Sequence, residues 1–574
     1  MLSTLGAGLL TVALILVVPG LSEAQAGDSA ETETPEGLFF DVTNINVVNV
    51  DVYVTDKKGN RVMDLGPDDF EVYENGQKME ITNFYAVSNG RPLPPPESMA
   101  SDPRVNRPTR PTLELEEIGR PQTPEDQRLY LIVYVDNFNL HPGTRNRTLN
   151  RMHRFISESV GPDDKVMISS YDQSLNVRQT FTSDTQLATS ALLDLEELSA
   201  SAVHRDAERL RVLEDIEDTE ESLRAVQAVR SYADVTYNQM TFVLNGLDKQ
   251  IQALSGLVGR KAIVYVSDGI PMVIGEDLFI AVDEQFERAN ARLEAAAYDL
   301  TSRYRELVAK ANASNITFYT LDAGGLRAHD SLSAEYGGSR SGGSLIYIDS
   351  IRKANLQEPL HILADDTGGK AITNTNAITA ELAKVTQDFK NYYSIGYQPP
   401  HHQDGRYYKI EVKTKKRGLK VRHRNGYRDK TAEARLADGS MATLFFGGER
   451  NPIEAKISFS SPSGDGRFQT VPMSIHIPLG RVALAPQDGF YIGRVKVSVV
   501  VMDEEGGISP VQQQEPVSIK IPAAEIEKAR QQNFIYDLGL TLRPGFSRVA
   551  IGIRDEIAAE TSFLRESINL GSKG

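Results

Sequence analysis

Four short apolar runs, each followed by an aspartate, constrain the fold of this chain most strongly. The runs are Leu131–Val135, Val166–Tyr171, Ala262–Ser267 and Ile316–Leu321, and long stretches of helical pattern separate them. Continuous apolar strands of this length are typical of parallel sheets, which are buried on both faces. The intervening helices supply the crossovers, so residues 128–400 are predicted to form a doubly wound, Rossmann-type α/β domain.

The rest of the chain is predicted to fold as separate modules, since 574 residues allow three or four domains of roughly 100–200 residues each. Strand-like alternation and tight turns predict flanking β-sandwich modules with an Ig-like pattern. The predicted parts are an N-terminal β-sandwich over 38–90, a Pro-rich linker over 91–127, a helical insertion near 196–250, a β extension over 401–430 that closes the α/β region, and a C-terminal β-sandwich over 440–574.

The N-terminus has the pattern of an export signal. Leu9–Val18 is apolar apart from Thr11, and Ala24-Gln25-Ala26 offers a small-residue cleavage site, so residues 1–26 are predicted to be a signal peptide. The apolar run is short for a transmembrane helix of about 20 residues, although an uncleaved anchor is the alternative. We therefore expect an exported protein, periplasmic or secreted, without a transmembrane span after cleavage.

Composition and missing motifs exclude several function classes. The chain has no cysteine, which rules out thiolate nucleophiles and cysteine zinc sites. A formal net charge of −16 argues against nucleic acid as a partner. No H-E-x-x-H, G-x-S-x-G or phosphate-binding loop is present, so no enzymatic activity is predicted. His401-His402, beside the Asp404-Gly405 turn, is predicted to be a solvated hairpin tip.

Aspartates at the strand ends are the candidate site residues. Asp136, Asp172, Asp268 and Asp322 follow or end the four runs. Ligands of open parallel sheets bind beyond the carboxyl ends of the strands, and carboxylates there suit hard cations. Each aspartate taken alone has a structural reading, as a cap of the following turn or helix. For Asp136 and Asp268 together we expect a ligand site, with contributions from the adjacent Asn139 and Gly269.

These segments resemble a known family. Leu131–Val135 with Asp136, and the later Ser267-Asp268-Gly269, are similar to the von Willebrand factor A (vWA) domain. The chain resembles the secreted VWFA-related proteins abundant in acidobacteria, over roughly residues 38–430 and more weakly beyond. The further matching segments are Asp69 to Asn75-Gly76, Ile81 to Phe84, Tyr393 to Tyr397, and Val421 to Tyr427.

The resemblance implies a metal-ion-dependent adhesion site, from which this chain departs. The family pattern has Asp-x-Ser-x-Ser after the first strand, but Phe138 and Leu140 occupy the serine positions. No matching threonine occurs near residues 199–206. Asp136 and Asp268 remain, so the resemblance implies either a degenerate site for Mg²⁺ or another divalent cation, or a metal-free domain that binds through its loops.

Three functions stay open on the sequence alone. The first is a non-catalytic binding or adhesion protein that captures a protein or cell-surface ligand near Asp136 and Asp268. The second is a structural or assembly component of the cell envelope that acts through its β modules. The third, a hydrolase with an unrecognised site, lacks a readable set of catalytic groups. The charged stretch Glu196 to Arg224 is predicted to be an exposed helix pair with i,i+4 ion pairs. The sequence does not indicate the oligomeric state.

Overall fold

The computed structural model describes residues 47–93, 127–199, 201–287, 289–326, 342–447, 450–464 and 468–571. The predicted signal peptide, residues 1–26, lies outside the described residues, as does the predicted linker except for residues 91–93 and 127. The chain divides into two compact units. One contains the described residues of 46–254 and 258–430, and the other contains residues 255–257 and the described residues from Thr431 onward. No helix in the described ranges is long and apolar enough to cross a membrane.

A six-stranded sheet forms the centre of the first unit. The strand order is β11-β10-β9-β6-β7-β8, and all neighbours are parallel except the pair β7 and β8. All four predicted apolar runs lie in its parallel strands. The strands are β6 (Leu129–Val135), β7 (Lys165–Tyr171), β8 (Leu175–Thr182), β9 (Arg260–Ser267), β10 (Ile316–Asp322) and β11 (Lys370–Ile372).

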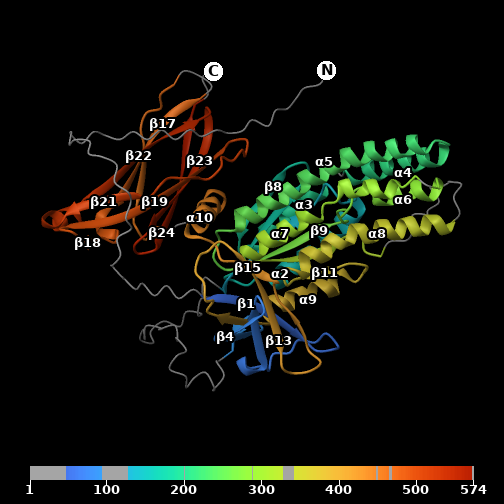
Figure 1. Ribbon diagram of the computed structural model, residues 1–574, viewed down its shortest axis with the longest axis horizontal. Coiled ribbons are helices and arrows are strands. Elements are labelled where there is room, and N and C mark those ends of the chain that lie inside the picture. Colours follow the sequence, from blue (N-terminus) through green and yellow to red (C-terminus); the bar gives the residue numbers. More distant parts are fainter. Residues whose placement is uncertain are drawn as a thin grey trace. The chain divides into compact units, whose positions relative to one another are not determined.

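Helices cover both faces of this sheet, as predicted for a doubly wound α/β domain (Figure 1). On one face, apolar side chains of three helices share a core with alternate residues of the strands. These helices are α2 (Pro142–Ser159), α3 (Thr185–Glu196) and α9 (Ile378–Lys390). The remaining helices of the domain are α4 (Ala202–Asp218), α5 (Ser222–Leu254), α6 (Glu276–Gln285), α7 (Thr301–Ala313) and α8 (Gly342–Asp365), with a 3-10 helix over Ala291–Tyr298.

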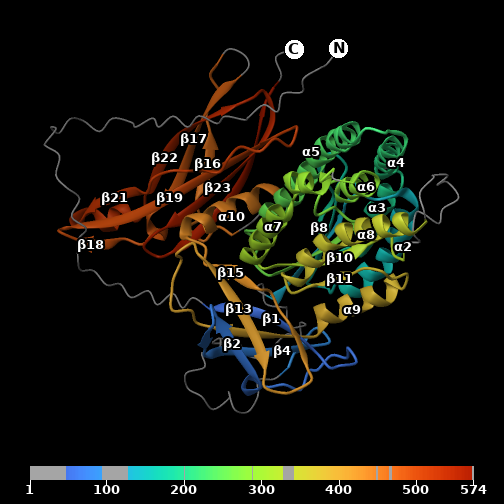
Figure 2. The same ribbon diagram turned by 45° about the vertical axis from the view of Figure 1, so that its right-hand side comes forward.

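The helical insertion consists of α4 and α5. Helix α5 has 33 residues, which corresponds to a length of about 50 Å. Its N-terminal part lies beside α4, and α4 in turn contacts α6, which contacts α8. Figure 2 shows α4, α5, α6 and α8 grouped together. The insertion therefore adds a helical layer above one region of the sheet.

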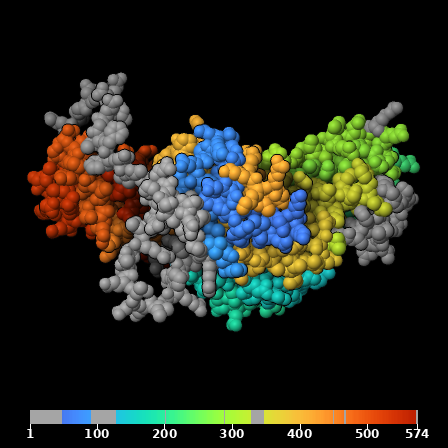
Figure 3. Space-filling view, turned by 90° about the horizontal axis from the view of Figure 1, so that it is seen from below, coloured from blue at the N-terminus to red at the C-terminus, as the bar shows by residue number. Residues whose placement is uncertain are grey.

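Strands from two distant parts of the chain form one β-sandwich in the first unit. One sheet has the order β14-β1-β12-β4-β5 and the other β15-β13-β2-β3, and they share one apolar core. Figure 3 shows the blue N-terminal strands against orange residues of the later strands. The strands are β1 (Val48–Thr55), β2 (Phe70–Glu74), β3 (Gln77–Met79), β4 (Ile81–Ser88), β5 (Arg91–Pro92), β12 (Tyr392–Tyr397), β13 (Tyr407–Thr414), β14 (Lys420–Arg422) and β15 (Gly426–Arg428).

This pairing joins two segments that the sequence analysis treated separately. The predicted module over 38–90 and the predicted extension over 401–430 contribute to the same two sheets, and β12 lies between β1 and β4. The physical reason is size: the short N-terminal segment alone has too few strands to bury both faces of a core. Strand periodicity identifies the strands but carries no information on this long-range pairing.

The second unit is a β-sandwich with one helix against it. Sheets β16-β17-β22 and β18-β19-β23-β24 enclose one core, with β20 and β21 paired to β19. Helix α10 (Ala432–Phe446) is capped by Thr431. It includes residues 440–446, which were predicted to belong to the β region. The remaining elements are β16 (Lys456–Phe459), β17 (Gln469–Pro478), β18 (Ala485–Gln487), β19 (Phe490–Asp503), β20 (Gln512–Gln513), β21 (Val517–Pro522), α11 (Ile526–Ala529), β22 (Asn533–Leu542), β23 (Gly545–Asp555) and β24 (Glu560–Leu570).

Candidate functional site

The four strand-end aspartates lie at one edge of the central sheet. Asp136 follows β6, Asp172 follows β7, Asp268 follows β9, and Asp322 ends β10, and these strands are parallel neighbours. We call this carboxyl edge, with Asp136, Asn139, Asp268 and Gly269, the crest. The structure thus brings the predicted ligand-binding residues together, in the position where open α/β sheets bind ligands.

Asp136 is fully buried and saturated with hydrogen bonds. Its Oδ2 accepts from the hydroxyl of Tyr265 at 2.6 Å, from Oγ of Ser267 at 3.0 Å and from Nδ2 of Asn139 at 2.7 Å. Burial raises the pKa of Asp136, while these donors oppose the rise. Asp136 therefore ties strand β6 to strand β9 and holds Asn139 in place.

Asp268 is also buried, and it anchors the start of helix α2. Its Oδ2 lies 2.9 Å from the backbone nitrogen of His141, 2.7 Å from Nδ1 of His141 and 2.9 Å from Oγ1 of Thr144. The other ring nitrogen of His141, Nε2, lies 2.8 Å from Oδ2 of Asp206 on α4. The hydrogen bonds with Asp206 and Asp268 raise the pKa of His141 to about 9. A protonated imidazole therefore lies between two carboxylates at neutral pH.

Gly269 permits a close approach between the crest and α8. Its φ of +103° lies in the region that side chains rarely adopt, and a Cβ here would lie 2.8 Å from the carbonyl oxygen of Leu356. Its backbone nitrogen donates to Oγ of Ser267 at 3.1 Å. Gly269 thus shapes the loop after β9, so that α8 can close over this edge of the sheet.

The arrangement of the crest does not suit a divalent cation. Mg²⁺ needs about six oxygen ligands, but Phe138 and Leu140, at the serine positions of the family pattern, are buried and apolar. Oδ2 of Asp136 and Oδ2 of Asp268 each accept several protein donors. The ring of His141, whose pKa is raised to about 9 by hydrogen bonds to carboxylates, already pairs with Asp268. The metal role predicted for Asp136 and Asp268 therefore gains no support from the geometry.

Two residues of α4 reach the loops of the crest and a third lies buried beside them, which the sequence analysis missed. Asp206 pairs with His141, Arg205 lies over the ring of Phe138 with Cζ 4.4 Å from its centroid, and the largely buried Arg209 pairs with Asp277 at 2.6 Å. The prediction of an exposed helix pair is wrong for Arg209, although His204 and Glu208 form an exposed i,i+4 pair. Helical spacing alone does not reveal which charged residues of an insertion face a sheet edge.

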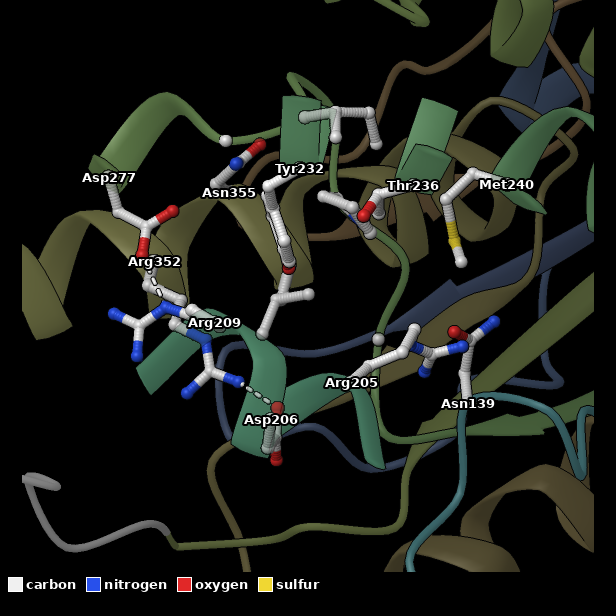
Figure 4. Close-up of a pocket in the computed structure, with 15 residues that line it drawn as sticks. Asn139, Arg205, Asp206, Arg209, Tyr232, Thr236, Met240, Asp277, Arg352 and Asn355 are labelled. Carbon is white, nitrogen blue, oxygen red and sulfur yellow. Dashed lines mark hydrogen bonds and ion pairs between the residues drawn. The ribbon is translucent and has the colours of Figure 1, made fainter. Parts of the chain in front are cut away.

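A pocket of about 70 Å³ lies between the crest and the helical insertion, and we call it the insertion pocket. Asn139 and Gly269 of the crest line it together with residues of α4, α5, α6 and α8. Figure 4 shows Arg205 beside Asn139, and dashed lines mark the ion pairs of Arg209 with Asp277 and of Arg352 with Asp206. The pocket is therefore lined by charged and polar side chains together with apolar ones, which include Met240, Ile274 and Leu356.

A second polar cluster lies in the β-sandwich of the first unit. The buried carboxylate of Glu74 accepts from Tyr397 at 2.7 Å and from Tyr427 at 2.9 Å, and Nε2 of His401 lies 2.9 Å away. Nδ1 of His401 lies 2.9 Å from Oδ2 of Asp429. The prediction that His401 is a solvated hairpin tip is therefore wrong. Ligand atoms of His401, Asp404 and Asp429 also lie within 4.8 Å of one another, as a metal site would require.

Comparisons with known proteins assign no family. No family model matches the chain, and no curated protein matches it. Among solved structures, the chain is similar to the conserved hypothetical protein BatB from Bacteroides thetaiotaomicron, at 14% identity over 46% of this chain and 96% of that one, with a TM-score of 0.19. The relation to the VWFA-related family stays a prediction.

Two further structures are similar over more of the chain. One is a von Willebrand factor type A protein from Catenulispora acidiphila, at 8% identity over 78% of this chain and 67% of that one, with a TM-score of 0.20. The other is the pilus adhesin SpaC from Lactobacillus rhamnosus GG, at 8% identity over 78% of this chain and 53% of that one, with a TM-score of 0.23. Because these TM-scores are all below 0.5, the function proposed below rests on the geometry of the site.

Proposed function

We propose that the chain is a non-catalytic binding protein that captures a protein or cell-surface ligand at the crest of its α/β domain. One observation carries this proposal: the crest residues Asn139 and Gly269 line a pocket together with charged residues of the helical insertion. A cavity at the carboxyl edge of an open parallel sheet is the default ligand position in this architecture.

The bonding of His141 supports binding rather than catalysis. A general base needs a ring nitrogen within reach of a substrate proton or of a nucleophile. Both ring nitrogens of His141 face carboxylates instead, those of Asp268 and Asp206. The hydroxyl of Ser267 at the crest donates to Asp136. These groups therefore hold the crest rigid, which suits a preorganised binding surface.

The proposal includes export from the cytoplasm, to the periplasm or the exterior. The apolar run Leu9–Val18 and the following small residues support it. Cell fractionation with N-terminal sequencing of the recovered protein tests this part. A mature chain that begins near residue 27 in the periplasm or medium supports export, and a full-length cytoplasmic chain contradicts it.

Selection of ligands on the immobilised protein tests the binding function. Displayed random peptides and arrayed surface glycans are the probes, and each enriched ligand is remeasured on Asp206→Ala and on Glu158→Ala. Asp206 lies at the crest, whereas Glu158 lies in the last turn of α2, the far end of an 18-residue helix of about 27 Å. We expect the affinity to change about tenfold with Asp206→Ala, which removes the carboxylate partner of Arg352 and His141, and not to change with Glu158→Ala.

Two outcomes would contradict the proposal. No enrichment on any probe argues against a binding function of this kind. Ligands whose binding is equal in both variants, but which bind the unit after Thr431, would favour the alternative of an envelope assembly component that acts through its β modules. Circular dichroism of each variant establishes that a loss of binding is not a loss of folding.

A further inference from the structure

The insertion pocket contains three arginines and two aspartates, and this balance determines what it can bind. The arginines are Arg205, Arg209 and Arg352, and the aspartates are Asp206 and Asp277. The lining thus has one more arginine than aspartate. In a partly desolvated pocket, a guanidinium attracts an anionic group more strongly than it would in water.

Two of the three arginines are bound to the two aspartates. Nε of Arg209 lies 2.6 Å from Oδ2 of Asp277, and Nη2 of Arg352 lies 2.6 Å from Oδ1 of Asp206. Asp206 also faces Nε2 of His141 at 2.8 Å, so both of its oxygens have partners. These pairs form the walls of the pocket, and neither of them includes Arg205, the third arginine.

Arg205 is placed to bind an anion. Its Nη1 is buried and has no hydrogen-bond partner among the described residues. The guanidinium lies over the ring of Phe138, a contact that holds it in position without using its N–H donors. Asp136 attracts it electrostatically, but Oδ2 of Asp136 accepts from Tyr265, Ser267 and Asn139. A buried donor without an acceptor costs free energy, which a ligand oxygen would recover.

We propose that the insertion pocket binds a carboxylate side chain of a protein partner through the guanidinium of Arg205, without a divalent metal ion. This inference rests on the proposed function, because the pocket belongs to the crest. A cavity of about 70 Å³ has room for several water molecules or for a small group such as a carboxylate. The single guanidinium of Arg205 suits a monoanionic carboxylate better than a phosphate dianion. The helical insertion thereby acquires a role, since α4 supplies Arg205.

Phe138 connects this proposal to the departure from the adhesion-site pattern. The residue at a serine position of that pattern is here the aromatic ring against which Arg205 lies. A serine at this position would remove the cation–π contact, and a metal ion would meet the positive charge of Arg205 nearby. Phe138 thus lacks the metal-binding hydroxyl of the pattern and also provides the ring that holds the guanidinium of Arg205 at the crest.

Ligand-observed NMR on the full chain tests the proposal. The probes are acetyl-glycyl-aspartyl-glycinamide, its asparaginyl counterpart and inorganic phosphate, each with excess EDTA and then with Mg²⁺. We expect saturation transfer to the aspartyl peptide in EDTA, and binding about tenfold weaker for the asparaginyl peptide and for Arg205→Gln. Arg205→Lys, which keeps the charge but not the planar fork, should retain part of the affinity. Arg211→Gln, at an exposed position of the same helix, is the matched control and should bind normally.

The remaining outcomes separate the carboxylate site from the binding function itself. Binding that requires Mg²⁺ overturns the metal-free site, and preferential binding of phosphate overturns the carboxylate assignment. Failure of the aspartyl peptide on the wild type, while crest-dependent ligands are still enriched by selection, overturns this inference and leaves the proposed function standing. Failure of both overturns both. If Arg205→Gln does not fold, the relative binding of the three probes to the wild type and to Arg205→Lys still tests whether the pocket binds a carboxylate through Arg205.

Discussion

His141 and Asp268 are joined twice: the backbone nitrogen and Nδ1 of His141 lie 2.9 Å and 2.7 Å from the same oxygen, Oδ2 of Asp268. The pairing fixes the ring at the start of α2, where its other nitrogen meets Asp206. The loop after β6, the loop after β9 and the helical insertion are thereby connected by one side chain. The charge of His141 should consequently matter for the stability of the crest.

We predict that the stabilisation provided by His141 depends on pH. Its pKa is about 9 in the folded chain and about 6.5 in an unfolded one. The contribution is therefore fully present below pH 6.5 and is lost as the pH rises through about 9. Because the side chain is 37% exposed, solvent screening reduces it, and we expect about 1 to 2 kcal/mol.

Urea unfolding of the wild type and of His141→Gln, from slightly acidic to alkaline pH, measures this effect. The difference between the two should shrink as the pH rises. His204→Gln is the matched control, because His204 forms only an exposed i,i+4 pair with Glu208. A difference that stays constant across the pH range, or an NMR titration of His141 near its ordinary pKa, would refute the prediction.

We predict that Mg²⁺, Mn²⁺ and Ca²⁺ do not bind at the crest. Calorimetric titration of the full chain should show no saturable binding that is lost in Asp268→Asn, because Oδ2 of Asp268 already accepts three hydrogen bonds. His401→Gln serves as the second variant, since His401, Asp404 and Asp429 could hold a cation elsewhere. Tight binding that disappears with Asp268→Asn, but not with His401→Gln, would restore the adhesion-site reading.

The sequence predicts the sheet of the α/β domain well, for a physical reason. Strands that are buried on both faces consist of continuous apolar residues. Leu131–Val135 and the three similar runs can therefore be recognised from the local sequence, without knowledge of the strands that pair with them. The parallel arrangement then brings Asp136 and Asp268 to the same edge. Both features follow from local pattern and from the general rules of α/β connection.

What the sequence does not predict depends on contacts between distant segments. His401 looks like part of a turn, but Glu74, more than 300 residues earlier, binds it. Asp206 looks like one of many charged residues of a surface helix, yet it meets His141 across 65 positions. The residue type of a charged side chain does not indicate whether it is exposed to solvent or buried in an ion pair. Only the tertiary fold distinguishes the two.

We predict that Glu74 is essential to the β-sandwich of the first unit. Its buried carboxylate accepts from Tyr397 and Tyr427 and faces His401, so Glu74→Ala leaves three polar groups without their acceptor. The expected loss of stability is about 3 to 5 kcal/mol, and Tyr427→Phe should cost about 1.5 kcal/mol.

The matched control for Glu74 is Glu71 on the same strand, which forms an exposed pair with Lys78 at 2.7 Å. Glu71→Gln should change stability far less than Glu74→Ala, because an ion pair in solvent contributes little. Urea unfolding followed by circular dichroism and tyrosine fluorescence measures all three variants. If the Glu74 and Glu71 substitutions lower the free energy of unfolding equally, the buried cluster stabilises the fold no more than an exposed ion pair does.

We predict that Gly269→Ala destabilises the crest by about 2 to 4 kcal/mol, because an alanine adds two costs there. The φ of +103° is unfavourable for any side chain, and the new Cβ would lie 2.8 Å from the carbonyl oxygen of Leu356. Gly76→Ala is the control, since Gly76 has a φ of +85° but nothing within 4 Å of a Cβ, and it should cost about 1 kcal/mol. Thermal unfolding compares them. If the two substitutions reduce stability equally, α8 must shift to make room for the new methyl group. Gly269 would then not be required for the close approach of α8 to the crest.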